Sequence, residues 1–233
     1  IDVLTSPLKK DENGLFSMDY EDFEAKCADT KAKLVYWCNP HNPTGRVWSE
    51  EELRRVAEIV EKYNLWIISD EIHCDLMRRG ITHTPMAKIM PDYPKLITCM
   101  SPTKSFNMAG LAFSNVVIRD AAARAEFTER DKLFGMVNPL SLTAAKAAYD
   151  RGGPWLEALR EYLDANFAFV RDYLAELLPG ARMYIPEATY LAWVDLSACL
   201  PGEEDLPGFF ANEAGVLLEG GDSLFVGNAR GYV

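Results

Sequence analysis

The sequence lacks several features that mark particular classes of protein. It contains no apolar run that approaches the ~18 residues needed to cross a membrane. It also has no excess of basic residues, because its formal net charge is −11 at pH 7. Proteins that bind nucleic acid usually present a basic patch. The sequence therefore predicts partners other than a membrane or a nucleic acid.

Metal-binding and disulfide patterns are missing as well. The chain has five cysteines and three histidines, and no two cysteines form a Cys-x-x-Cys pair. His41, His73 and His83 are too scattered to indicate a zinc site. Three of the cysteines lie in or beside apolar runs, where free cysteine behaves as a small hydrophobic residue. This usage predicts a reducing, cytoplasmic location.

The composition that remains is that of a soluble globular protein, with 48% hydrophobic and 25% charged residues. Four apolar runs have the length of buried strands, at residues 34–38, 65–69, 96–100 and 116–118. A helix is predicted between the first two, because Ser49 and Glu52 form a capping box before an apolar stripe of helical spacing. This strand–helix–strand pattern indicates an α/β fold, in which ligands bind at the carboxyl ends of the strands.

Lys104 follows one of these apolar runs directly. A lysine at the end of a buried strand is costly to desolvate, and that cost becomes useful if the amine must act as a nucleophile toward a carbonyl cofactor. The neighbouring hydroxyl residues Ser101, Thr103 and Ser105 are suited to a phosphate group. Together they suggest pyridoxal 5′-phosphate (PLP). The alternative is an ordinary solvated loop lysine.

Two other polar residues follow predicted strands. Asp70 comes after the run at 65–69, and a carboxylate there can keep the pyridine nitrogen of PLP protonated. An aspartate in this place is also typical of a helix N-cap. Asn42 lies in the segment Asn39-Pro-His-Asn-Pro-Thr-Gly45, a rigid non-helical loop able to hold an amide against a ligand. The alternative for this loop is an ordinary turn.

These three segments, in this order, resemble the fold-type I PLP enzymes of the class I/II aminotransferase superfamily. Within it, the chain is most similar to the bacterial cystathionine β-lyase, or cysteine-S-conjugate β-lyase, branch. Three details carry that finer resemblance: His73 where many aminotransferases have tyrosine, the continuation Arg46-Val-Trp48, and Tyr190-Leu-Ala-Trp193.

The resemblance implies an α/β fold, with a three-layer PLP-transferase-type large domain built on a mainly parallel sheet and part of a smaller α+β C-terminal domain. We expect the large domain at 1–150, a long connecting helix at 151–180 and the small domain at 181–233. It implies that Lys104 binds the cofactor covalently and acts as the catalytic base. Further cofactor contacts are expected from Asn42, Asp70, His73, Ser101 and Thr103. For His73, a purely structural role is equally open.

The expected activity is cleavage of cystathionine or another cysteine S-conjugate to a thiol, pyruvate and ammonia, by a cytoplasmic homodimer that takes an amino acid as substrate. No residue separates this reaction from transamination on first principles. A second alternative is a PLP-sensing domain of a transcriptional regulator.

Relatives of this type are longer, so we expect the chain to be an internal part of a longer protein. Its first four residues look like a strand, and one face of the sheet is expected to be partly uncovered. The chain alone would lack the Gly-rich phosphate loop, a stacking aromatic residue and a substrate-binding arginine, and would be inactive. Later elements are predicted as helices at 121–133, 140–150, 154–178 and 206–214, and as a strand at 190–196.

Overall fold

A computed structural model of the chain describes residues 2–132, 136–220 and 229–233. These residues form two compact units. One unit contains residues 27–162 together with Glu187–Thr189. The other contains residues 2–26, Leu163–Pro186 and the described part of 190–233. All of the predicted site residues belong to the first unit.

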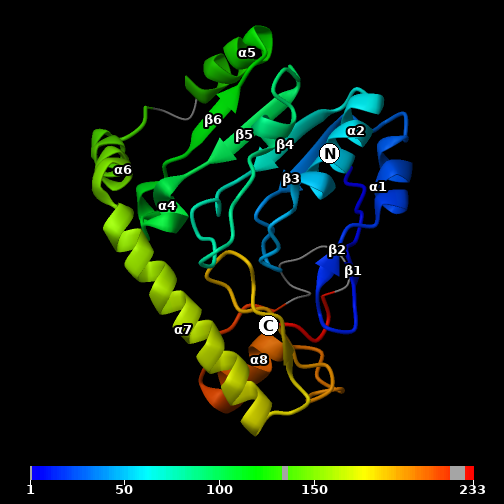
Figure 1. The fold of residues 1–233 in the computed structure, drawn as a ribbon, viewed down its shortest axis with the longest axis vertical. Helices are drawn as coiled ribbons and strands as arrows, with labels where there is room; N and C mark the ends of the chain where they lie inside the picture. The colour runs from blue at the N-terminus through cyan, green and yellow to red at the C-terminus, as the bar shows by residue number, and fades with distance from the viewer. Residues whose placement is uncertain (1, 133–135, 221–228) are drawn as a thin grey trace. The chain divides into compact units, whose positions relative to one another are not determined.

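The first unit is built on a four-stranded sheet in the order β3-β4-β5-β6 (Figure 1). The strands are β3 (Leu34–Cys38), β4 (Trp66–Asp70), β5 (Leu96–Met100) and β6 (Asn115–Ile118). The first three run parallel, and β6 pairs antiparallel with β5. The four predicted runs are confirmed as strands to within one residue, and the sheet is mainly parallel as expected.

The helix between β3 and β4 begins where the capping box predicts. It is α2 (Glu50–Lys62), and the Ser49 hydroxyl accepts a hydrogen bond from the Glu52 backbone N–H at 3.2 Å. The Glu52 carboxylate accepts one in return from the Ser49 N–H at 2.8 Å. Three residues at helical spacing, Leu53, Val56 and Val60, are fully buried. The sequence therefore encodes both the start of this helix and its buried face.

The two faces of the sheet are covered unequally. Alternate residues such as Trp37, Ile67 and Leu96 are buried, at 0–5% exposure. The opposite face carries Tyr36 and Leu34, which are 68% and 49% exposed. Side chains alternate between the two faces along a strand. The difference in exposure therefore shows that one face of the sheet is covered and the other is partly open. It agrees with the expectation of a partly uncovered sheet face.

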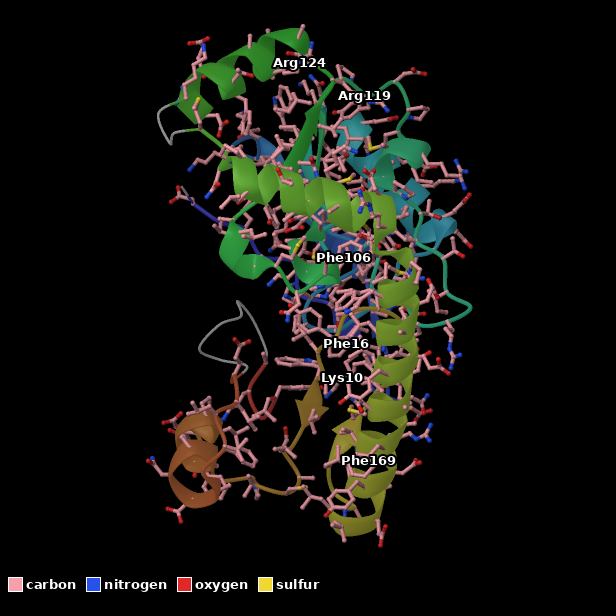
Figure 2. The ribbon with its side chains drawn as sticks, turned by 90° about the vertical axis from the view of Figure 1, so that its left-hand side faces the viewer. Lys10, Phe16, Phe106, Arg119, Arg124 and Phe169 are labelled. Carbon is pink, nitrogen blue, oxygen red and sulfur yellow. The ribbon has the colours of Figure 1, made fainter. Side chains whose placement is uncertain are left out.

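Short helices and turns connect and follow the strands in this unit. They are α3 (Met86–Ile89), α4 (Pro102–Ser105), η1 (Ala109–Leu111), α5 (Ala121–Asp131), α6 (Pro139–Arg151) and the start of α7 (Gly153–Leu177). Phe106, which follows α4 and is labelled in Figure 2, contacts Tyr149 and Trp155 with ring centroids 6.5 and 5.8 Å apart. A Cβ on Gly152 would approach the Phe106 ring to 2.3 Å, so glycine is needed where α6 ends.

The predicted helices are confirmed within the described residues. The helix predicted at 121–133 ends at Asp131, and residue 133 lies outside the described residues. In α7, Leu156 and Phe167 of the predicted apolar stripe are buried at 9% and 4% exposure. Leu177, at the end of the stripe, is 57% exposed, so the buried stripe ends before the helix does.

The second unit is built from the N-terminal and C-terminal segments of the chain. Its elements are β1 (Lys9–Lys10), β2 (Phe16–Ser17), α1 (Tyr20–Cys27), β7 (Arg182–Met183), β8 (Val194–Asp195), α8 (Leu206–Phe209) and η3 (Phe210–Ala214). The Lys10 ammonium donates to Asp195 Oδ2 at 2.9 Å and also to the Tyr232 hydroxyl. Lys10 and Phe16 are partners in the β1–β2 ladder, and both are labelled in Figure 2.

Two strand predictions in this unit are corrected. The strand predicted at the first four residues is not formed by residues 2–4, and residue 1 lies outside the described residues. The strand predicted at 190–196 is reduced to Val194–Asp195, and residues 190–193 before it form no strand. The division at 1–150, 151–180 and 181–233 stays a prediction, and it differs from the compact units because residues 2–26 pack with the C-terminal segment.

We predict that Ser49→Ala lowers the free energy of unfolding by about 1 kcal/mol, since it leaves a helix N–H without its capping oxygen. Urea unfolding monitored by circular dichroism would measure this change. Thr5→Ala removes an exposed hydroxyl outside any element and should leave stability within ~0.5 kcal/mol of the parent. Equal stabilities for the two variants would contradict the capping account.

Candidate active site

Three parallel strands end at one edge of the sheet, and their ends are level. The pairing register places Cys38 of β3, Asp70 of β4 and Cys99 of β5 directly beside one another. The ladder continues one residue further, because the Asn39 N–H donates to Asp70 O at 3.0 Å and the Glu71 N–H donates to Cys99 O at 2.8 Å. The three loops that carry the predicted site residues therefore start at the same edge.

Asp70 is the last residue of β4, and its carboxylate is half-buried. One oxygen, Oδ2, accepts a hydrogen bond from the Tyr36 hydroxyl at 2.8 Å. The other, Oδ1, accepts one from the Ile72 N–H at 3.2 Å. Turns and no helix follow at residues 72–75, so the alternative of a helix N-cap is wrong. Each carboxylate oxygen retains acceptor capacity for a further donor.

His73 is 2% exposed and lies within electrostatic reach of both predicted charges. Burial and, to a lesser extent, the positive charge of Lys104 lower the pKa of His73 to about 4, against the opposing negative charge of Asp70. The imidazole is therefore neutral at pH 7. The assignment of Asp70, His73 and Lys104 to a cofactor site stays a prediction.

Lys104 lies in α4, half-buried between the buried residues Thr103 and Ser105. The hydroxyl of Ser105 donates to Asp75 Oδ2 at 2.9 Å. The backbone oxygen of Asp75 in turn accepts from the Arg160 guanidinium, from Nε at 3.0 Å and from Nη2 at 2.7 Å. A chain of hydrogen bonds therefore fixes the segment that carries Lys104. Asp75 and Arg160 belong to none of the sequence motifs, so their contribution was not predicted.

The two hydroxyls predicted to bind phosphate already have partners inside the chain. Ser101 is the N-cap of α4, and its hydroxyl accepts from the Thr103 N–H at 3.1 Å. It also bonds the Thr103 hydroxyl at 2.7 Å and donates to Phe113 O. The structure therefore gives Ser101 a capping role. Phosphate binding by Ser101 and Thr103 stays a prediction.

The Asn-Pro loop has a buried anchor and an exposed tip. Asn39 is fully buried and ties the start of the loop to residues outside it, donating to Thr84 O at 3.1 Å and accepting from the Trp48 N–H at 3.3 Å. Asn42 is exposed. Gly45 closes the turn with a φ of 67° and an N–H that donates to His41 O at 2.7 Å. Of the two asparagines, Asn39 is therefore committed to contacts within the protein, and the contact of Asn42 with a ligand stays a prediction.

A charged network holds this loop to a segment far along the chain. The Arg46 guanidinium pairs with Glu187 and with Glu52, each at 2.8 Å, and its side chain is only 11% exposed. Glu187 also accepts from the Val47 N–H at 2.8 Å. Partly buried, hydrogen-bonded pairs of this kind are stronger than surface ion pairs.

A second buried carboxylate was missed by the sequence analysis. Glu71 is 1% exposed and accepts from the Ser69 hydroxyl at 2.9 Å, the Met86 N–H at 3.0 Å and the His83 ring at 2.9 Å. The His83 partner lies twelve residues away along the chain. Such a pairing follows no local periodicity, so no sequence signal could have revealed it.

Residues 2–221 match the sequence family Aminotransferase class I and II. The chain belongs to that family. This confirms the resemblance inferred from the motifs.

The chain is also similar to individual proteins of known name. Cystathionine beta-lyase PatB of Bacillus subtilis (strain 168) is 39% identical over 223 residues, which are 94% of this chain and 57% of the relative. Protein MalY of Escherichia coli (strain K12) is 36% identical over 83% of this chain and 50% of its own length. The chain thus spans little more than half of the curated relatives it matches.

Solved structures agree with the fold. The PLP-bound C–S lyase from Staphylococcus hominis has a TM-score of 0.92 and 47% identity, covering 97% of this chain and 58% of that one. A PLP-bound putative aminotransferase from Clostridium difficile 630 has a TM-score of 0.93 and 41% identity, covering 99% and 60%. The α/β architecture predicted from the sequence is confirmed.

Two searches of the described residues gave negative results. None of the helices in residues 2–132, 136–220 and 229–233 is long and apolar enough to cross a membrane. In the same residues, no group of three or more histidine, cysteine, aspartate or glutamate side chains is arranged to hold a metal ion.

We predict that His73 makes the protein less stable in mild acid. Its folded-state pKa of about 4 lies below its ordinary value of 6.5. The fold therefore favours the neutral form, and the stability is fully present above pH ~6.5 and is lost as the pH falls toward 4. His73→Asn should reduce the loss between pH 7 and pH 4.5 by on the order of 2 kcal/mol.

Urea unfolding at both pH values would measure this difference. The matched control is Glu204→Gln, whose side chain is 81% exposed and whose pH dependence should follow that of the parent. Parallel pH dependences for His73→Asn and the parent would show that His73 titrates normally.

Proposed function

We propose that the protein containing this chain is a PLP-dependent C–S β-lyase that cleaves cystathionine or other cysteine S-conjugates to a thiol, pyruvate and ammonia. The observation that carries the proposal is the 47% identity, over 97% of this chain, to a structure described as a PLP-bound C–S lyase. The relatives named cystathionine beta-lyase support it. So does the chemistry of the groups at the sheet edge.

These groups fit PLP by type and by environment. Lys104 offers an amine, and Asp70 offers a carboxylate with acceptor capacity left on both oxygens. His73 is neutral at pH 7 and so adds no second positive charge beside the amine. Asn42 presents an exposed amide on the neighbouring loop. The aldehyde of PLP requires an amine, and its basic ring nitrogen requires a carboxylate. The remaining groups are neutral and can donate hydrogen bonds.

When bound, PLP supplies an electron sink for negative charge at the α-carbon of the amino acid. Lys104 would hold the cofactor and, once released by the substrate, take the α-proton as general base. Asp70 would keep a proton on the ring nitrogen, where an ionised partner is most valuable as charge builds up. Asn42 would donate its amide N–H to the ring oxygen. His73, buried near both charges, would help to position them.

The hydroxyls of Ser101 and Thr103 would hold the cofactor phosphate from the side of α4. Their bonds to each other and to Phe113 compete with that role. Each hydroxyl can rotate and retains acceptor or donor capacity, so one of these internal bonds would be exchanged for one to the phosphate.

The choice of reaction depends on the β-carbon of the substrate. A thiolate is a good leaving group, since a free thiol has a pKa of ~8.5, and its departure commits the substrate to elimination. Transamination by a class I/II aminotransferase is the second candidate. The specific observation favouring it is the 41% identity to a structure described as a PLP-bound putative aminotransferase.

We also propose that the protein is a cytoplasmic homodimer acting on a small amino acid. All five cysteines are free, which supports a reducing compartment. Exposed apolar residues cluster at Met136, Val137, Leu140 and Leu142, with exposures from 55% to 96%. Contiguous exposed apolar groups are typical of association surfaces.

We predict that the full-length protein, given cystathionine or cystine and no 2-oxo acid, releases pyruvate, ammonia and a sulfur product in equal amounts over many turnovers. Coupled assay of pyruvate with quantitation of ammonia would measure this. Lys104→Ala should abolish the release, whereas Lys146→Ala, whose side chain is 74% exposed, should retain it. Turnover that requires an added 2-oxo acid would instead favour transamination.

A further inference from the structure

Tyr36 has an unusual place for a tyrosine. It lies on β3, two residues before Cys38, so the two side chains share one face of the sheet. Cys38 is the register partner of Asp70, which brings Asp70 to the same face. The Tyr36 ring is largely exposed, at 68%, yet its hydroxyl donates to Asp70 Oδ2 at 2.8 Å. An exposed side chain thus makes a well-formed bond to the predicted cofactor ligand.

The other groups that face Asp70 do not duplicate this bond. Cys38 and Cys99 flank Asp70 on the neighbouring strands, and burial followed by the charge of Asp70 raises the pKa of both thiols, that of Cys38 to about 11. Both are therefore neutral, and thiols are weak donors. His73 is neutral at pH 7, and the positive charge of Lys104 contributes to that by lowering the pKa of His73.

The phenol itself stays protonated over the working pH range. Partial burial of its phenol group raises the pKa of Tyr36 most, and the hydrogen bond to Asp70 and the negative charge of Asp70 raise it further. Tyr36 is therefore a permanent donor. A hydrogen bond to the charged form of a carboxylate favours that form, and a supporting bond of this kind also fixes the orientation of the group it contacts.

We propose that Tyr36 is a positioning residue that holds Asp70 ionised and oriented for its partner, the protonated ring nitrogen of the cofactor. The inference rests on the proposed function for the identity of the cofactor. The proton shared by the ring nitrogen and the Asp70 carboxylate can be bound to either group. By stabilising the carboxylate, the phenol of Tyr36 shifts that proton toward the ring, where it is needed for catalysis.

The test uses the full-length holoprotein and its Tyr36→Phe variant, which loses only the hydroxyl. Reconstitution with PLP enriched in ¹⁵N at the ring allows NMR to report ring protonation directly. We expect the ¹⁵N resonance of the variant to move toward that of an unprotonated pyridine. We also expect kcat to fall about 10-fold, the lower end of what loss of a supporting hydrogen bond costs, with KM changed less than ~3-fold.

Tyr162→Phe is the matched control, because Tyr162 is 64% exposed and lies on α7 away from Asp70 in sequence. Its resonance and kcat should match the parent. A double-mutant cycle with Asp70→Asn separates direct from indirect action. If Tyr36 acts through Asp70, then Tyr36→Phe should have almost no further effect in that background.

A ¹⁵N resonance and kcat of Tyr36→Phe equal to those of the parent would overturn the proposal, as would a full effect of Tyr36→Phe in the Asp70→Asn background. A different result, a parent protein that binds no PLP, would contradict the proposed function without contradicting the Tyr36–Asp70 bond. In that case the Tyr36–Asp70 bond is still tested in the apoprotein. Tyr93, Tyr149 and Tyr232 also have raised pKa values. Ultraviolet titration should therefore show one fewer late-titrating tyrosine in Tyr36→Phe than in the parent. Loss of an early-titrating tyrosine instead would sink the inference.

Discussion

The candidate site depends on one constraint, the parallel register of β3, β4 and β5. That register sets Cys38, Asp70 and Cys99 level at the end of the sheet. Because the ladder continues through Asn39 and Glu71, the loops leave the sheet from fixed points. A slip of one residue would move every side chain to the opposite face. Asp70 would then point into the buried side of the sheet, away from Tyr36.

The candidate site also requires that the charge of Asp70 be stabilised by hydrogen bonds and by neutral neighbouring side chains. A half-buried carboxylate is costly unless its oxygens are hydrogen-bonded. Here, Tyr36 and Ile72 each donate to one oxygen. The neighbouring thiols and His73 are neutral because burial moves their pKa values away from pH 7. Cys38, Cys99 and His73 therefore add no charge of their own beside Asp70 and Lys104.

Much of this arrangement follows from local patterns in the sequence. Apolar runs of five residues predict β3 and β5 to the residue, and the Ser49 capping box predicts the start of α2. Polar residues directly after these runs predict which loops meet at the sheet edge. These predictions hold because strand length, helix caps and the carboxyl-end rule are encoded within a few residues of one another.

The rest depends on contacts between residues far apart in the chain. Tyr36 and Asp70 are separated by 34 residues, and Ser105 and Asp75 by 30. Lys10 and Asp195 are separated by 185, and their contact places the start of the chain with its C-terminal segment. No periodicity connects such pairs. The hydrogen bond from the Ser101 hydroxyl to Phe113 O spans twelve residues and likewise follows no local pattern.

The central claim is that Lys104 carries the cofactor, and one measurement tests it most directly. The full-length holoprotein would be reduced with borohydride, digested, and its peptides mapped by mass spectrometry. We expect a single pyridoxyl group, on Lys104. A label on Lys95, Lys132 or Lys146, with Lys104 unmodified, would contradict it.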